Sequence, residues 1–407
     1  MNVSPGSPPL PFSSAPLPCP LGMTAREYAV HCRTLGVRGG EPWALDRYRR
    51  LFKLGDRSDP LLVPSTSPAT SLTPNPPWLP PVVRTHLSDS PEGRVLKFAQ
   101  RIPGRSPSDP PLETESVLIP MIGKKGRRTY TVCVSSQVGC AMGCAFCQTA
   151  QMGLIRSLTP DEIVAQWFAA RHVVLPDPSL GLDPLAPITN IVFMGMGEPL
   201  DNLDAVILAI EVFTDHRGVG IPMSKITIST VGRIDGIRRL NDKIREHGWH
   251  RLGFAVSLNA PNDHIRSQIM PINRAMPLQP LRDALLQRRV FGGFKYCFEY
   301  VLIPGVNDAP EHARLVADFI LGRAEFAGQP PLKGLVNLIP YNPRDHSPWT
   351  APDESSVDQF LSWLTAEGVY TKRRRTKGRD TMAACGQLGN PSLRRRPLSH
   401  LTISRNP

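Results

Sequence analysis

Three cysteines stand close together in the sequence, at a spacing that can hold an iron–sulfur cluster. Cys140, Cys144 and Cys147 form a C-x3-C-x2-C pattern. Three thiolates can bind three irons of a 4Fe-4S cube and leave the fourth iron open. An open iron can chelate the amino and carboxylate groups of S-adenosylmethionine and reduce its sulfonium, which releases a 5′-deoxyadenosyl radical. The alternative is structural zinc, which takes four ligands, and the next Cys or His downstream is only His172.

A second pattern, Gly195-Met196-Gly197-Glu198-Pro199, directly follows a strand-like apolar segment. Glycines let a backbone approach a ligand closely, and the carboxylate of Glu198 can accept hydrogen bonds from an ammonium group. In isolation such a pentapeptide is usually only a turn. Behind the cysteine pattern it predicts a loop that grips the amino group of S-adenosylmethionine.

Two further cysteines and one glutamate stand apart from these patterns. Cys133 lies inside a strand-like segment, where a cysteine is more often a small buried apolar side chain. Cys385 lies in a polar, glycine-rich segment after a basic run, and by itself is as consistent with a reactive thiol as with an inert one. Glu115, taken alone, is typical of a solvated carboxylate. The remaining cysteines, which we interpret as structural or incidental, are Cys19, Cys32 and Cys297.

Strand-like and helix-like segments alternate from about residue 115 onward. The expected strands are 129–135, 188–194, 225–230, 252–258, 295–303 and 334–340. The expected helices are 160–175, 202–214, 234–247, 278–290, 309–322 and 353–367. Six βα units in series predict an α/β fold with a parallel sheet that forms a partial or full barrel. The chemistry of such folds lies at the C-terminal ends of the strands, which is where the cysteine pattern and Glu198 fall.

Composition and charge narrow the class of partner. The chain has 407 residues, a net charge of +12 and a pI near 9.6, which favours a polyanion: nucleic acid first, an anionic membrane second. No apolar run approaches the ~20 residues that span a bilayer, and the N-terminus lacks the basic-then-apolar order of a signal peptide. We therefore expect a cytoplasmic protein whose eight cysteines are mostly reduced.

Changes in composition suggest four regions. Residues 1–22 are rich in proline and serine and read as a disordered leader. Residues 23–112 predict a small helical region with helices within 24–56 and a proline-rich linker over 59–82. The catalytic domain is expected over 113–390, and 391–407 form a basic tail.

Taken together, the sequence resembles the RlmN/Cfr family of radical-SAM RNA methyltransferases. The resemblance covers about 113–390. The segments that carry it are 115–120 (Glu-Ser-Val-Leu-Ile-Pro), 133–140, the cysteine pattern, 195–199, 257–263, 336–343 and 383–388 (Ala-Ala-Cys-Gly-Gln-Leu). The resemblance implies a partial (β/α)6 radical-SAM barrel. Members methylate an adenine at C2 (RlmN type) or C8 (Cfr type) in large-subunit ribosomal RNA, and some also act on transfer RNA. We expect C2 rather than C8, in 23S ribosomal RNA with transfer RNA as a second substrate.

The resemblance also implies roles for individual residues. Cys385 would take a methyl group from one S-adenosylmethionine, and the radical from a second would convert that methyl into a methylene radical that adds to the adenine. Cys133 would then attack Cys385 to form a transient disulfide and release the product, with Glu115 as the proton acceptor. The cofactor would be bound by Gly197, Glu198, Ser229, Ser257, Leu258, Asn259 and Asn342. An electron donor such as flavodoxin or ferredoxin is implied as a partner, and we expect a monomer.

The chain departs from the family pattern in three places. Asn259 stands where family members usually carry His. The stretch 121–128 is longer than usual, and the first 110 residues show little likeness to the family's helical RNA-binding appendage. Two alternatives remain: a radical-SAM enzyme with a small-molecule or protein substrate, which does not need Cys133 and Cys385 together, and a non-catalytic RNA-binding protein with a structural cluster.

Overall fold

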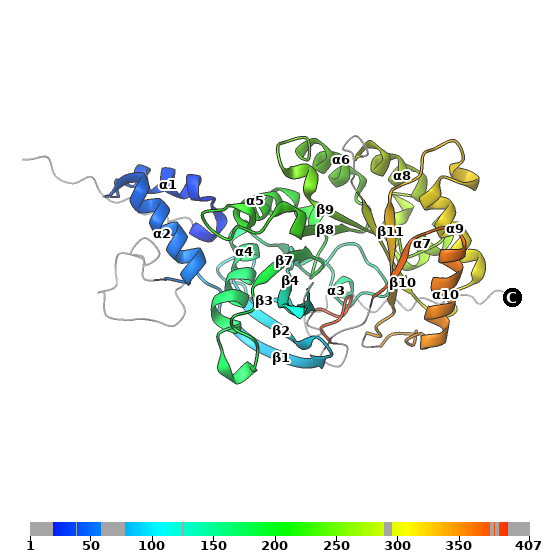
Figure 1. Ribbon diagram of the computed structural model, residues 1–407, viewed down its shortest axis with the longest axis horizontal. Coiled ribbons are helices and arrows are strands. Elements are labelled where there is room, and N and C mark those ends of the chain that lie inside the picture. Colours follow the sequence, from blue (N-terminus) through cyan, green and yellow to red (C-terminus); the bar gives the residue numbers. More distant parts are fainter. Residues whose placement is uncertain are drawn as a thin grey trace, which may run out of the picture.

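A single ten-stranded sheet organises the protein. The computed structural model describes residues 19–37, 39–57, 78–123, 126–288, 295–344, 346–374, 378 and 382–389 (Figure 1). Within this part of the chain the strand order is β1-β2-β3-β4-β7-β8-β9-β10-β11-β12. Because β1 and β12 stand at opposite ends of that order and do not pair, the sheet is an open, partial barrel rather than a closed one.

Six of the strands and the helices between them are the βα units that the sequence predicts. The strands are β4 (Arg128–Cys133), β7 (Ile188–Phe193), β8 (Ile226–Thr230), β9 (Gly253–Ser257), β10 (Tyr296–Leu302) and β11 (Gly334–Pro340). The helices are α4 (Pro160–Ala169), α5 (Leu203–Thr214), α6 (Ile234–Lys243), α8 (Leu278–Gln287), α9 (Pro310–Leu321) and α10 (Glu354–Ala366). Neighbouring strands from β4 to β11 pair in parallel, which confirms the expected α/β fold.

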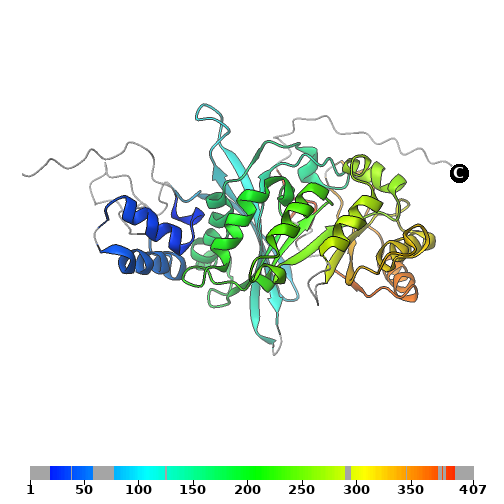
Figure 2. The ribbon, with the colours of Figure 1, turned by 90° about the horizontal axis from the view of Figure 1, so that it is seen from above.

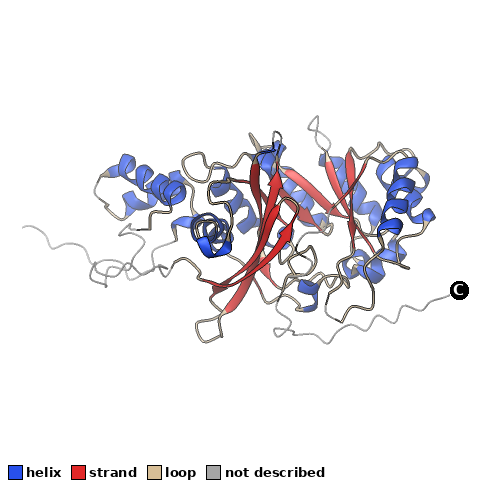
Figure 3. Ribbon diagram, turned by 60° about the horizontal axis from the view of Figure 1, so that its bottom comes forward, coloured by secondary structure: helices blue, strands red, loops and turns tan. Residues whose placement is uncertain are grey.

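Helices cover the outside of this curved sheet, as Figure 3 shows. Their apolar faces and the strands form one continuous core, because parallel strands are buried on both faces. A smaller apolar cluster lies around the cysteine pattern and includes Met142, Ile269 and Tyr341. Shorter elements complete the fold: α3 (Gln148–Gln151), α7 (Asp263–Ile269), β12 (Thr371–Arg373) and the two-stranded sheet of β5 (Gln137–Val138) with β6 (Arg156–Ser157).

Three antiparallel strands extend the sheet beyond β4, and none of them is among the strands that the sequence predicts. β1 (Val82–Ser90), β2 (Gly93–Ile102) and β3 (Leu112–Ile122) pair in series and join β4 through a hairpin. Residues 82–102 therefore form strands, and the prediction of a helical region reaching to 112 is wrong for them. Figure 2 shows these strands crossing the width of the molecule (cyan). The long stretch 121–128 is this hairpin turn; Lys124 and Lys125 lie outside the described residues.

The two expected N-terminal helices dock on the flank of the barrel. α1 (Ala25–Thr34) starts at a capping box between Thr24 and Glu27, and α2 (Gly40–Leu54) follows it. The ring of Phe52 stands 6.5 Å from that of Trp167 and 6.4 Å from that of Phe168, both on α4. The backbone of Ala25 donates to Asp215, just beyond α5. The helices are thus tied to the barrel by aromatic packing.

Ordered structure begins earlier than the predicted boundary at residue 23. Residues 1–18 of the predicted leader lie outside the described residues, as do 59–77 of the predicted linker and the basic tail 391–407. Pro20–Gly22, however, form a 3-10 turn that packs against α4 and α5, and Leu21 is 0% exposed. The prediction of a disordered leader is therefore wrong for this turn. Among the described residues no helix combines the length and apolarity needed to cross a membrane.

Leu21 offers a test of this packing. We expect Leu21→Ala to lower the free energy of unfolding by about 2–5 kcal/mol, because it removes a fully buried side chain and leaves a cavity. The matched control Leu185→Ala removes a side chain that is 89% exposed and is expected to change stability little. Chemical denaturation of the two variants measures the difference. Equal stabilities would show that the turn does not contribute to the core.

Candidate active site

The cysteine pattern lies on a loop that leaves the C-terminal end of β4. Two glycines shape the loop in left-handed conformations, Gly139 with φ 75° and Gly143 with φ 70°. A Cβ at Gly139 would lie 1.9 Å from the carbonyl oxygen of Gly153, so only glycine fits where the loop closes on itself. The backbone of Cys140 donates to that same carbonyl at 3.1 Å.

The far side of the loop is held by two other elements. The backbone N–H of Ala145 donates to the carbonyl of Ile269, at the end of α7, at 2.9 Å. The buried guanidinium of Arg344 donates through Nε to the carbonyl of Ala145 at 2.8 Å. The loop is thereby fixed from both sides, and Cys140, Cys144 and Cys147 line one cavity at the mouth of the barrel.

The donor set of this loop fits an iron–sulfur cluster. Burial raises the pKa of the thiols of Cys140 and Cys144, and in each case the charge of a neighbouring cysteine of the pattern raises it further. Among the described side chains, no three Cys, His, Asp or Glu are already gathered at the spacing of one metal ion. A cube places each thiolate on a different iron, so wider spacing of the sulfurs agrees with it.

The loop after β7 packs directly on the start of the cysteine loop. The N–H of Gly195 donates to the carbonyl of Val134 at 3.1 Å, and the N–H of Glu198 donates to Oε1 of Gln137 at 2.9 Å. A Cβ at Gly195 would lie 2.7 Å from the carbonyl oxygen of Val134, and one at Gly197, where φ is 101°, would lie 2.6 Å from Cβ of Gln137. These glycines are therefore required for the approach of two loops, a reason that the sequence analysis had not given.

Glu198 is held in this loop as a buried acceptor. Its side chain lines the cysteine cavity while the residue is only 2% exposed. One carboxylate oxygen accepts from the N–H of Leu200 at 3.1 Å and the other from the N–H of Val231 at 3.0 Å. Burial raises the pKa of Glu198 to about 7, although these hydrogen bonds oppose the effect. A cation that entered the cavity would restore the charge of the carboxylate.

Most of the residues expected to bind the cofactor line this same cavity. Gly197, Glu198, Ser229, Ser257, Asn259 and Asn342 all do so, from the ends of β7, β8, β9 and β11. Leu258 does not; its side chain is buried in the core. This arrangement follows from the parallel sheet, since the C-terminal ends of its strands meet at one rim.

Asn259 departs from the family pattern and has a structural use. It adopts a left-handed conformation with φ 56°, which Asn tolerates better than most residues. Its Oδ1 accepts from the N–H of Val301 at 3.0 Å, and its own carbonyl accepts from Nδ2 of the buried Asn307 at 2.7 Å. The side chain thus ties the end of β9 to β10 while it lines the cavity.

A second cavity lies inside the barrel, next to the first. It encloses about 490 Å³, within the range of pockets that bind small ligands, and Cys133 and Cys385 both line it. Cys385 also lines the cysteine cavity, so it stands at the border between the two. Burial raises the pKa of the Cys133 thiol to about 12 and also raises that of Cys385, while the guanidinium of Arg374 lowers both.

Three residues of this second cavity were missed from the sequence. Arg374 follows β12 and forms an ion pair with Glu299 on β10, at 3.8 Å. Cys297 lies beside Glu299 and lines the same cavity. Arg374 belongs to the basic run 372–379, and nothing in its spacing distinguishes it from the neighbouring basic residues.

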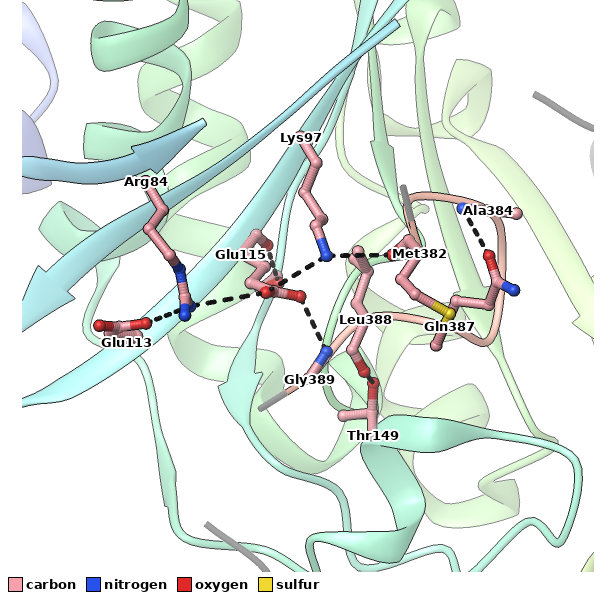
Figure 4. Close-up of polar contacts among 11 residues, drawn as sticks. Arg84, Lys97, Glu113, Glu115, Thr149, Met382, Ala384, Gln387, Leu388 and Gly389 are labelled. Carbon is pink, nitrogen blue, oxygen red and sulfur yellow. Dashed lines mark hydrogen bonds and ion pairs between the residues drawn. The ribbon is translucent and has the colours of Figure 1, made fainter. Parts of the chain in front are cut away.

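Glu115 lines neither cavity. It lies on β3, 5% exposed, and its carboxylate is engaged by Lys97 on β2, by Arg84 on β1 and by the backbone N–H of Gly389 (Figure 4). The expected proton acceptor is thus fully occupied in this structure, and its role in the chemistry stays a prediction.

The three thiols of the loop predict iron binding. We expect protein that is reconstituted anaerobically with iron and sulfide to hold about four irons per chain. Cys144→Ala should lose most of this iron, because two thiolates do not hold the cube. The control Cys297→Ala removes a thiol that lines only the second cavity and should retain it. Elemental analysis for iron and zinc on the same samples decides the matter, since stoichiometric zinc without iron would contradict the cluster.

Comparison with known proteins agrees with the geometry. A family model described as the Radical SAM superfamily matches residues 134–316, which run from the end of β4 into α9. This superfamily implies a 4Fe-4S cluster and S-adenosylmethionine as cofactors, and the three-cysteine loop and the rim around Glu198 fit them.

Relatives narrow the family further. The chain is 42% identical over 285 residues to a probable dual-specificity RNA methyltransferase RlmN 1 of Protochlamydia amoebophila; the match covers 70% of this chain and 72% of the relative. It is 42% identical over 275 residues to a dual-specificity RNA methyltransferase RlmN of Lawsonia intracellularis, covering 67% and 71%. A crystal structure of a radical SAM methyltransferase from Sphaerobacter thermophilus superposes with a TM-score of 0.73 at 33% identity, covering 90% of this chain and 98% of that one. The chain therefore belongs to the RlmN/Cfr family of radical-SAM RNA methyltransferases.

Proposed function

We propose that this enzyme methylates C2 of an adenine in 23S ribosomal RNA, and also in transfer RNA, with Cys385 as the methyl carrier. The observation that carries the proposal is the position of Cys385, which lines both the cysteine cavity and the inner cavity. A carrier must meet the methyl donor on one side and the acceptor base on the other. Relatives named dual-specificity RNA methyltransferases support the choice of RNA substrates.

The rim residues bind the cofactors in this proposal. Cys140, Cys144 and Cys147 hold the cluster, and Glu198 accepts hydrogen bonds from the ammonium group of S-adenosylmethionine. Polar groups at the neighbouring strand ends complete the pocket: Ser229, Ser257, Asn259 and Asn342, with the backbone of Gly197. Leu258, between Ser257 and Asn259, supports them from the core. When bound, the cluster and S-adenosylmethionine would supply a transferable methyl group and a carbon radical. An external one-electron donor of the flavodoxin or ferredoxin type reduces the cluster, and the enzyme works as a monomer.

The inner cavity holds the target base in this proposal. A ring carbon of adenine is a poor nucleophile, so it does not attack a sulfonium directly and needs a carrier thiol. The carbon carried on the sulfur of Cys385 bonds to the base, and Cys133 then bonds to that sulfur as the carbon–sulfur bond breaks. The electron pair left on the carbon takes up a proton, which completes the methyl group. Arg374 favours the thiolate of either cysteine through its charge.

RNA must deliver the base to the inside of the barrel. An adenine reaches an interior pocket only after it has been unstacked, which costs a few kcal/mol. The net charge of +12 provides attraction to phosphates, which positions the RNA without reading its sequence. Glu115 remains our predicted proton acceptor; it becomes available only when Lys97 and Gly389 release its carboxylate.

Glu198 gives a test of cofactor binding. We expect Glu198→Gln to weaken S-adenosylmethionine binding roughly 10- to 100-fold, the worth of a hydrogen bond to a charged group. In the wild type, affinity should rise as the pH passes upward through about 7, because the carboxylate with its raised pKa then ionises. The Gln variant should lack this rise. Equilibrium dialysis on cluster-loaded protein measures both, and identical pH profiles would remove Glu198 from the ammonium site.

The two remote cysteines test the proposed function itself. Cys385→Ala has no carrier and should give neither methylated RNA nor a covalent complex. Cys133→Ala keeps the carrier, so the protein should stall while joined to RNA through Cys385. The stalled species should appear as a slow band that nuclease collapses and thiol reductant leaves intact, because a thioether is not reducible.

The control for this experiment is Cys297→Ala, which removes a third thiol from the same inner cavity and should turn over without trapping RNA. A small-molecule enzyme would give no RNA adduct from any variant. Normal turnover of Cys133→Ala on RNA would show that the carrier mechanism does not apply to this protein.

A further inference from the structure

The short segment that carries Cys385 is held mainly by elements distant in sequence. We call residues 382–389 the carrier loop. On one side the cluster-binding region holds it: the N–H of Gln148 donates to the carbonyl of Gly386 at 2.6 Å, and Oγ1 of Thr149 donates to the carbonyl of Leu388 at 2.5 Å. These contacts fix the middle of the loop next to α3 and the cysteine pattern.

The two ends of the carrier loop are held by a buried ion pair on the opposite side. Nζ of Lys97 donates to the carbonyl of Met382, the first residue of the loop, at 3.2 Å. Oε2 of Glu115 accepts from the N–H of Gly389, the last residue, at 2.8 Å. Lys97 and Glu115 are themselves paired, 3.6 Å apart, and Figure 4 shows the pair between the two ends of the loop.

Burial makes this arrangement sensitive to the loss of either partner. Lys97 is 7% exposed and Glu115 is 5% exposed. Charges so far from water need each other and need hydrogen bonds to their remaining donors and acceptors. Here the carbonyl of Met382 accepts one hydrogen bond from Lys97, and the N–H of Gly389 donates one to Glu115. Since Lys97 lies on β2 and Glu115 on β3, both contacts come from the strands that extend the sheet beyond the barrel.

We propose that Lys97 and Glu115 are positioning residues that clasp both ends of the carrier loop and so hold Cys385 at the border of the two cavities. This inference rests on the proposed role of Cys385 as methyl carrier. It assigns Lys97 a part in the reaction although Lys97 lines neither cavity and touches no cofactor-binding residue. It also gives Glu115 a task before any proton is transferred.

The first test measures how firmly the loop is held, with no need for turnover. Cluster-loaded protein is treated anaerobically with iodoacetamide, and the alkylation rate of each cysteine is followed by peptide mass spectrometry. We expect Lys97→Met to raise the rate at Cys385 about tenfold, the effect of losing one charge-assisted hydrogen bond on a local opening equilibrium. The rate at Cys297 serves as the internal standard, and Lys97→Arg should restore the slow rate at Cys385.

The matched control is Arg84→Met. Arg84 stands 3.9 Å from the carboxylate of Glu115, so this variant also removes a nearby positive charge, but Arg84 has no hydrogen bond to the carrier loop. It should alkylate at the wild-type rate. The proposal would be overturned if the alkylation rate at Cys385 rose equally in Arg84→Met and Lys97→Met, or if it did not rise in Lys97→Met.

The second test uses Glu115→Gln and separates positioning from proton transfer. Methyl transfer to Cys385 precedes any proton abstraction from the base, so a residue that only accepts that proton leaves methyl loading unchanged. If Glu115 clasps the loop, Glu115→Gln should lower the amount of S-methyl-Cys385 several-fold at unchanged iron content. Glu115→Gln keeps the shape of the side chain, so it remains informative if Lys97→Met does not fold. Normal methyl loading in this variant would overturn the clasp.

The outcomes also distinguish the clasp from the proposed function. If wild-type protein carries no methyl on Cys385, the carrier mechanism fails. The alkylation comparison still shows whether Lys97 and Glu115 hold the loop.

Discussion

The close approach of two loops at the end of the parallel sheet determines the site. The chain leaving β4 and the chain leaving β7 run so near each other that Gly195 and Gly197 have no room for a side chain. This contact places Glu198 beside the cysteine loop, and the N–H of Val231 beyond β8 fixes its carboxylate. The cysteine loop and Glu198, our proposed cluster ligands and ammonium acceptor, thus line one cavity because neighbouring parallel strands end at the same rim.

Around that rim the protein has acidic groups and thiols whose burial disfavours their charged forms. The pKa values of Glu198, Glu299, Cys133 and Cys385 are all raised, by burial first. Arg374 is the cation that reaches the inner cavity. Positively charged occupants favour the charged forms of these groups. Irons are such occupants, and so is a sulfonium with an ammonium group. The site is therefore electrostatically compatible with the cofactors that the family implies.

The six βα units and the position of the cysteine pattern and Glu198 could be predicted from the sequence, because each depends on residues that are close together in the chain. Apolar strands followed by amphipathic helices define the six βα units, and the cysteine pattern and Glu198 follow strands directly. β1, β2 and β3 were all missed. The first of them, Val-Val-Arg-Thr-His-Leu-Ser-Asp-Ser, is half exposed and follows a proline-rich stretch. Lys97 and Arg374 could not be assigned, because their meaning comes from partners on other strands. Asn259 was recognised as a departure, yet its left-handed conformation appears only in three dimensions.

The ion pair between Lys97 and Glu115 has a consequence for the order of events. In this structure both oxygens of Glu115 are engaged, one by Lys97 and one by Gly389, and an engaged carboxylate is a poor base. Whatever frees Glu115 to accept a proton also unfastens the loop that carries Cys385. In the mechanism that we propose, delivery of the methyl and removal of the proton would therefore require two different conformations of the carrier loop, and the contacts of Glu115 would differ between them.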